Sequence, residues 1–473
     1  MSVREDANNP SWVVELGKML DAGPTSSRSG NRHYIHLVPQ WVTEMTSRKA
    51  YAPSVVSLGP FHHGDPALLP MEAHKRRAVV SLVRRSGKPL REFVGAMEEE
   101  APRLAAAYER RLGEDDYAWW SGGGRSFVEV MLADGCFLLE LARAFLLEGD
   151  VEEDYGRHDP VFSKHGYRHL RHVLASDVLL MENQLPMLLL RKILTILGGS
   201  ESYFMFDTMR KQGKIEHCWI QEDYLMNNQD PLHPLHFFLT WGPRTETAVA
   251  AASSASFAFF RRRPHSSSAS DPSSTENNED DFSESMPTAT ELHEAGVHFK
   301  ATSTILYGEW RKLEAISFRR GVLSIPVVQV DDYTAKKYLN LMAFERLEPG
   351  AGNDDITDFI FFMDGIIDSA KDVALLRSSG VVVNLLGSDE EVAHLFSNVL
   401  AKGAALSRDS RLRGVYRGVN AHCRKPWNKW RAMFMQTYMS NPWVFISLVA
   451  AVILLVATLV QTFYSAASFY MQG

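Results

Sequence analysis

The side chains of this chain that could carry out chemistry are mainly clustered carboxylates and histidines. Asp354, Asp355 and Asp358 form a D-D-x-x-D pattern, which binds magnesium and diphosphate in some helical enzymes. Further aspartates follow at four-residue intervals, which would stack carboxylates along one helix side where they could hold a hard divalent cation: Asp364, Asp368 and Asp372. Alternatively, the first three favour a helix N-terminus through its dipole and the last begins the next helix. We prefer this structural interpretation, because no second metal-binding helix accompanies the pattern.

Histidines offer two further candidate sites. His165, His169 and His172 are spaced at i, i+4 and i+7, so one helix face could present them to a metal ion. Their basic neighbours favour an ordinary polar helix surface. His62 and His63 follow a predicted strand, a position from which loop histidines can act in catalysis. No nucleophile or orienting partner can be assigned to them, so we favour a structural turn.

Other motifs exclude several classes of site. His293 and His298 are five residues apart, whereas a zinc-protease helix needs a spacing of four. Cys136, Cys218 and Cys423 are too scattered for a disulfide framework or a cysteine zinc cluster. Phosphate-binding loops, nucleophile elbows and kinase motifs are missing. We therefore predict no catalytic, cofactor-binding or metal-binding residues and no enzymatic activity. The alternative is a membrane-tethered, divalent-metal-dependent enzyme built on the aspartates or the His62–His63 loop.

The distribution of charge points to a membrane rather than to nucleic acid. The net charge is −7, and no charged residue follows position 431. An acidic body suits a nucleic-acid backbone poorly, so we expect no nucleic-acid partner. Seven basic residues and no acidic residue lie between 411 and 431, where anionic lipid headgroups would attract them: Arg411, Arg413, Arg417, Arg424, Lys425, Lys429 and Arg431.

Residues 443–463 predict a transmembrane helix. These 21 residues are free of charge, and at ~1.5 Å per residue they match a hydrocarbon core of ~30 Å. The alternative is a buried helix of a large domain. The basic residues on the N-terminal side predict a single-pass, tail-anchored protein whose body is cytoplasmic. The N-terminus lacks the apolar stretch of a secretory signal. The plasma membrane is favoured over the endoplasmic reticulum.

The apolar spacing of the body predicts a mainly α-helical fold with a small β-sheet, an α+β class. Helices are predicted at 67–85, 89–113, 126–148, 165–198, 334–347, 355–379 and 388–402. Strands are predicted at 55–58 and within 296–330, and capping boxes at 388–391 and 288–291. The chain divides into five regions: an N-terminal helix and linker (1–32), a helical body (33–410) with a disordered Ser-rich acidic insertion (264–286), a basic juxtamembrane segment (411–442), the transmembrane helix (443–463) and a short tail (464–473).

Nine stretches, in order along nearly the whole chain, resemble one family. They are APSVVSLGPFHHG (52–64), Met71-Glu72 with Lys75, MLADGCFLLEL (131–141), DVLLMENQLPMLLL (177–190), PTATELHEAGVHF (287–299), LSIPVVQVDDYTAKKYLNLMAFE (323–345), the run from 363 to 396, WNKWRA (427–432) and the apolar run 441–462. Together they are similar to the plant domain-of-unknown-function family number 247.

This resemblance implies a protein with one C-terminal membrane span and no established catalytic residues. Some grass members of the family are linked to pollen–stigma self-incompatibility, which implies a role in recognition or signalling. The Glu182-Asn183-Gln184 trio, which leads into Pro186, is expected to be a buried polar network at a helix junction. We therefore expect a membrane-anchored recognition or signalling protein that binds partner proteins.

Overall fold

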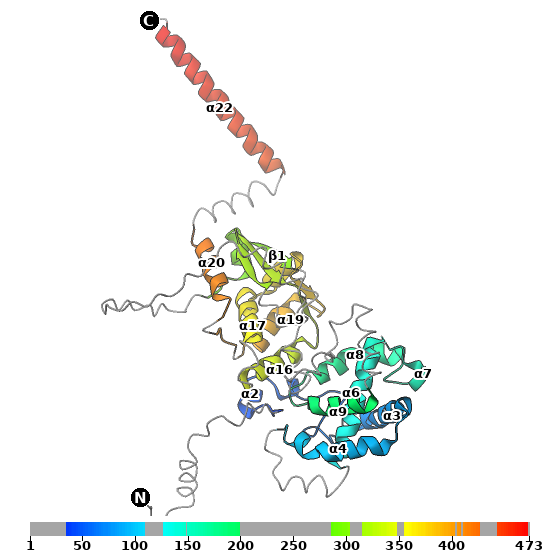
Figure 1. Ribbon diagram of the computed structural model, residues 1–473. Coiled ribbons are helices and arrows are strands. Elements are labelled where there is room, and N and C mark those ends of the chain that lie inside the picture. The colour runs from blue at the N-terminus through cyan, green and yellow to red at the C-terminus, as the bar shows by residue number, and fades with distance from the viewer. Residues whose placement is uncertain are drawn as a thin grey trace, which may run out of the picture.

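The computed structural model describes two lobes and a C-terminal helix. The described residues are 35–108, 126–147, 149–198, 285–302, 315–347, 354–402, 404–407, 410–425 and 442–471. Figure 1 shows helices α3 to α9 gathered in one lobe, and the strands with α16, α17, α19 and α20 in the other. Each lobe has its own hydrophobic core, so two packing units stabilise the body.

The first lobe is built from helices around a central apolar one. Its described helices are α3 (Leu69–Ser86), α4 (Leu90–Ala105), α6 (Phe127–Leu146), α7 (Glu152–Tyr155), α8 (Lys164–Val178) and α9 (Met187–Leu197). The α6 helix begins at Ser126, whose hydroxyl accepts a hydrogen bond from the Glu129 backbone N–H. A Cβ on Gly135 would lie 2.7 Å from the Ile193 side chain. The missing side chain therefore lets α6 and α9 pack closely.

The second lobe combines short strands with helices. Its described elements are α2 (Gln40–Met45), η1 (Arg48–Ala50), α14 (Ala289–Glu294), β1 (His298–Thr302), β2 (Ser317–Arg319), β3 (Val322–Pro326), β4 (Val328–Val330), α16 (Thr334–Leu347), α17 (Asp355–Ile366), α18 (Ala370–Ser378), β5 (Val382–Asn384), α19 (Asp389–His394), the π-helical turn η4 (Leu395–Leu400) and α20 (Arg413–Cys423). In one sheet β3 pairs with β1 in parallel and with β2 in antiparallel; in the other, β4 and β5 are parallel. The predicted mainly helical α+β body with a small sheet is confirmed.

Two predicted helices are each two α-helices in the structure, and the helix predicted at 388–402 is α19 followed by the π-helical turn η4. The segment 165–198 divides into α8 and α9, because Pro186 enforces an extended backbone before α9. The segment 355–379 divides into α17 and α18, and Ser369 with Asp372 forms a capping box at the start of α18. The predicted capping box at Thr288 and Glu291 is confirmed.

Three other local predictions are wrong, wholly or in part, and one is the helix predicted at 89–113, which ends at Ala105. Residues 55–58 are not a strand, because side chains rather than a neighbouring strand accept hydrogen bonds from their backbone. The capping box predicted at 388–391 is half formed. The Ser388 hydroxyl accepts from the Glu391 N–H, but the Glu391 carboxylate accepts from the Gly387 N–H instead of the Ser388 N–H.

The C-terminal helix α22 (Pro442–Met471) contains the predicted transmembrane segment and extends away from both lobes (Figure 1). Where the structure describes side chains, which in α22 means 446–447 and 449–463, no helix is both long and apolar enough to cross a membrane. The prediction of a transmembrane helix at 443–463 is therefore not supported by the structure.

Several predicted features lie outside the described residues. They are the N-terminal helix and linker (1–32), most of the Ser-rich insertion (264–284), and two of the juxtamembrane basic residues, Lys429 and Arg431. The end of the predicted insertion is described, and there Met286 is buried in the core of the second lobe. That end therefore belongs to the folded body.

Candidate functional site

The predicted polar network around Glu182, Asn183 and Gln184 is confirmed as buried, and it lies between the two lobes. The Asn183 amide accepts from the Leu58 N–H and donates to the carbonyls of Val56 and Asp177. The Gln184 amide donates to two carbonyl groups at the end of α8. These bonds hold the segment that follows α8 against the irregular segment 54–59. Such a satisfied network stabilises one arrangement of the chain.

Asp177 anchors the same irregular segment. Its carboxylate accepts from the backbone N–H groups of Ser54, Val55 and Val56 at 2.7–3.1 Å. Lys336 of α16, from the second lobe, donates to it at 2.9 Å. The Asn340 amide, one helical turn later, accepts from the Met181 N–H and donates to the Ala50 carbonyl. Side chains of α16 therefore join the two lobes through charged and neutral hydrogen bonds.

A buried lysine forms the charged centre of the first lobe. The Nζ atom of Lys75 lies 2.6 Å from a carboxylate oxygen of Glu72 and 2.6 Å from one of Asp134, and 3.2 Å from the Ser57 hydroxyl. Burial raises the pKa of Asp134 to about 6, although Lys75 opposes that shift. Asp134 also accepts from the Gly59 N–H. These contacts hold Ser57 and Gly59 against helices α3 and α6, so the cluster positions the 57–59 segment.

The predicted histidine loop lies beside this network. The Nε2 atom of His62 is 3.2 Å from a Glu182 carboxylate oxygen, and the other oxygen of Glu182 accepts from the Val38 N–H. Gly59, which precedes the loop, has a φ of +74°, and a Cβ there would lie 2.8 Å from the Gln184 carbonyl. These contacts agree with the structural-turn interpretation of Pro60–Gly64, in which His62 orients the loop.

The predicted aspartate cluster does not converge on one site. Asp358 is buried and accepts from the Ser407 N–H, whereas Asp354 is exposed at the start of α17. Asp372 accepts from the backbone and hydroxyl of Thr290 and from Ser369. The ladder of Asp364, Asp368 and Asp372 that the alternative metal-site hypothesis required is interrupted, because α17 ends at Ile366. As the structural interpretation predicted, Asp372 lies at the start of the next helix.

The histidines of α8 lie on its exposed surface. The His165 and His169 rings are 4.4 Å apart, and His172 accepts from the Arg171 guanidinium. In the part of the chain that the structure describes, no group of three or more His, Cys, Asp or Glu side chains is arranged to hold a metal ion.

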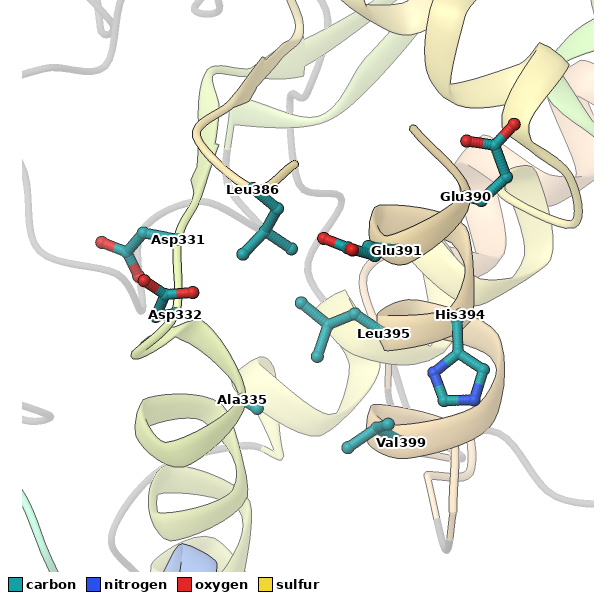
Figure 2. Close-up of a pocket in the computed structure, with 9 residues that line it drawn as sticks. All are labelled: Asp331, Asp332, Ala335, Leu386, Glu390, Glu391, His394, Leu395 and Val399. Carbon is teal, nitrogen blue, oxygen red and sulfur yellow. The ribbon is translucent and has the colours of Figure 1, made fainter. Parts of the chain in front are cut away.

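An open pocket in the second lobe is the candidate binding site. Its volume is about 490 Å³, and it lies between the start of α16, the loop after β5, and α19 with η4 (Figure 2). Four carboxylates and one histidine contribute to its rim: Asp331, Asp332, Glu390, Glu391 and His394. The remaining lining is aliphatic: Ala335, Leu386, Leu395 and Val399. Figure 2 shows Asp331 and Asp332 across the pocket from Glu391, with Leu386 and Leu395 between them.

Local structure positions two of these carboxylates. Asp331 accepts from the Tyr333 N–H and the Thr334 hydroxyl, which fixes it at the start of α16. Glu391 accepts from the Gly387 N–H. Asp332 and Glu390 are exposed. The described lining therefore carries four acidic side chains and one histidine.

Sequence reasoning did not identify this pocket. The Asp331-Asp332 pair directly precedes a predicted helix, and Glu390 and Glu391 belong to a predicted capping box. Nothing in the spacing of residues about 60 apart indicates that they share a pocket. The signal that could have found it is the pair of acidic residues just before or at the start of each of two helices, α16 and α19.

Comparisons with known proteins find a plant family and two of its relatives. A family model described as a plant protein of unknown function, DUF247, matches residues 35–457. The chain is 26% identical over 449 residues to UPF0481 protein At3g47200 of Arabidopsis thaliana, which covers 88% of this chain and 82% of that protein. It is 31% identical over 181 residues to putative UPF0481 protein At3g02645 of the same plant, or 38% of this chain and 33% of that protein. No solved structure matches the chain.

Proposed function

The chain belongs to the DUF247 family of plant proteins, and from this premise we propose that it is a recognition protein whose pocket between α16 and α19 binds a partner protein. The observation that carries the proposal is a contrast in how acidic groups are used. Asp134, Asp177 and Glu182 are buried and paired within the protein. The pocket instead presents carboxylates to solvent over an aliphatic floor, as an interaction site does.

We propose a non-enzymatic role for the same reason. A catalytic site needs a nucleophile or base oriented toward a space where a substrate can sit. The buried carboxylates that resembled catalytic groups in the sequence accept hydrogen bonds from the backbone, as Asp358 does from Ser407. His62 contacts Glu182, which itself holds the Val38 backbone. These contacts support positioning roles and favour recognition over a metal-dependent reaction.

The finer part of the proposal is attachment to a membrane through α22. Its described side chains between 449 and 463 are uncharged and exposed, including Leu454 at 68% and Phe463 at 72%. None of them belongs to either hydrophobic core. An exposed apolar helix of this kind needs a covering surface, and we propose that lipid provides it. The exposed basic residues of the preceding segment, Arg417, Arg424 and Lys425, support contact with anionic headgroups.

Photo-crosslinking from the body tests the recognition role. A photoreactive amino acid is placed at one exposed position at a time in the full-length protein in plant cells: Leu385 beside the pocket, Arg168 on α8 and Glu98 on α4. We expect a discrete crosslinked protein from position 385 and none from a version of the protein that is unfolded before irradiation. The absence of a specific crosslink from every position would contradict the proposed function.

A further inference from the structure

We propose that the partner segment recognised by the pocket is basic and aliphatic: a short peptide in which lysine or arginine alternates with leucine-like side chains. This inference rests on the proposed recognition role and names the chemistry of the partner. It is argued from the charge, the apolar lining and the extent of the surface around the pocket.

The negative charge of the rim determines that the partner segment is positively charged. The rim carries Asp331, Asp332, Glu390 and Glu391, and the described residues of its lining include neither lysine nor arginine. Like charges meeting across an interface are unfavourable, so acidic segments and nucleic-acid phosphates are disfavoured. Cationic side chains are attracted, and this attraction favours correct encounter more than high affinity.

The apolar lining of the pocket requires that the positively charged partner also carry aliphatic groups. Leu386, Leu395, Ala335 and Val399 also line the pocket, and Figure 2 shows Leu386 between Asp332 and Glu391. Lysine and arginine suit this arrangement, because their aliphatic stems can cover the apolar surface while their charged ends reach the carboxylates. A small hard cation would leave the aliphatic lining uncovered.

The surface beside the pocket favours a protein segment over a small free amine. Val383 of β5 and Leu385, directly before the lining residue Leu386, are 40% and 56% exposed. Both are exposed apolar side chains within three residues of Leu386, outside the pocket of about 490 Å³. A peptide can place a basic side chain in the pocket and an aliphatic one against Val383 and Leu385 at the same time.

Peptide binding to the full-length protein in nanodiscs of zwitterionic lipid tests the inference. The probes are three fluorescent heptapeptides, Leu alternating with Lys, Leu with Glu, and Ser with Lys; empty nanodiscs report binding to lipid. The pocket variant is Asp332→Asn with Glu390→Gln, whose side chains are exposed, so that folding is preserved. The matched control is Glu98→Gln with Glu153→Gln, which changes net charge equally on exposed positions of the first lobe.

We expect the Leu/Lys peptide to bind best, the pocket variant to weaken it at least about fivefold and the control to change it less than about twofold. Raising the ionic strength from ~0.1 M to ~1 M should also weaken it, because salt screens exposed charges. Leu385→Ser should weaken the Leu/Lys peptide more than the Ser/Lys peptide. Equal binding of the Leu/Glu peptide, or equal affinity of the pocket variant and the control, would overturn the inference.

Failure of this inference can be told apart from failure of the proposed function. If a partner crosslinks from Arg168 or Glu98 but not from Leu385, and no basic peptide binds, recognition stands and the assignment of its partner chemistry to this pocket is wrong. If no position crosslinks a partner, the recognition role itself fails.

Discussion

The Nζ atom of Lys75 lies 2.6 Å from the Asp134 carboxylate, and neither side chain is more than 1% exposed to solvent. Glu72 completes the cluster at the same distance from Lys75. Replacing only the lysine would leave two carboxylates without their buried cation. We expect Lys75→Met to lower the free energy of unfolding by about 3–5 kcal/mol, measured by denaturant titration of the full-length protein.

Arg76→Met is the matched control for that variant. Arg76 is on the same helix but is 64% exposed and 4.0 Å from Glu129, so its loss should change stability by less than about 1 kcal/mol. Equal stabilities of the two variants would show that the buried lysine does not stabilise the first lobe.

Glu345 should make stability depend on pH. Burial raises the pKa of its carboxyl group from 4.5 to about 7, even though it accepts hydrogen bonds from Ile356 and Thr357. Because the folded-state pKa is the higher one, this group's contribution is fully present below about pH 4.5 and is lost as the pH rises through about 7.

Unfolding titrations of the wild type and Glu345→Gln between these pH values measure that contribution. The wild type should lose up to about 3 kcal/mol more than the variant as the pH rises. Parallel pH profiles would show that Glu345 has the same affinity for protons in the folded and unfolded states.

Gly59 should not tolerate a side chain. Its φ is +74°, and a Cβ at this position would lie 2.8 Å from both the Gln184 carbonyl and the Tyr108 hydroxyl, which leaves no room for alanine. Gly59→Ala should lower the free energy of unfolding by about 2 kcal/mol or more, because the substitution introduces backbone strain and a steric conflict. The melting temperature of the variant should fall accordingly. Gly95→Ala, in α4 with open space around it, should be neutral or stabilising by up to about 1 kcal/mol. A smaller loss at Gly59 than at Gly95 would contradict this account of the turn.

The sequence predicted features that arise from local periodicity and missed those that arise from side-chain partners far along the chain. The helical spacing in 126–148 was sufficient for α6, whose burial follows from its own composition. The segment 55–58 has strand-like residues, yet it is irregular because Asp177 and Asn183, more than 100 positions later, accept its hydrogen bonds. Nothing in the residues of the segment itself indicates that distant side chains, and not a neighbouring strand, accept its backbone hydrogen bonds.

The site was less predictable than the fold for the same reason. The burial of Glu182, Asn183 and Gln184 followed from a polar trio among leucines. The pocket brings Asp331-Asp332 together with Glu390-Glu391 through packing of α16 beside η4. Only the tertiary arrangement shows that the two acidic pairs share an aliphatic floor.

The proposed lipid attachment predicts how the protein behaves on extraction. The full-length chain should remain with membranes during an alkaline carbonate wash, because the exposed apolar side chains of α22, such as Leu454 and Leu455, would be unfavourable in water. A variant ending at 431 should be released. Release of both proteins to the same extent would rule out α22 as the attachment, whereas the pocket could still bind its partner.

Removing the net negative charge of the pocket tests the central claim most directly. The variant Asp332→Lys with Glu390→Lys keeps the aliphatic lining and replaces two exposed carboxylates by cations. Because Asp331 and Glu391 remain, the four groups then carry no net charge, and the account predicts that this protein loses the wild-type preference for the Leu/Lys peptide over the Leu/Glu peptide. Retention of the wild-type preference for the Leu/Lys peptide would contradict recognition of a basic partner by this pocket.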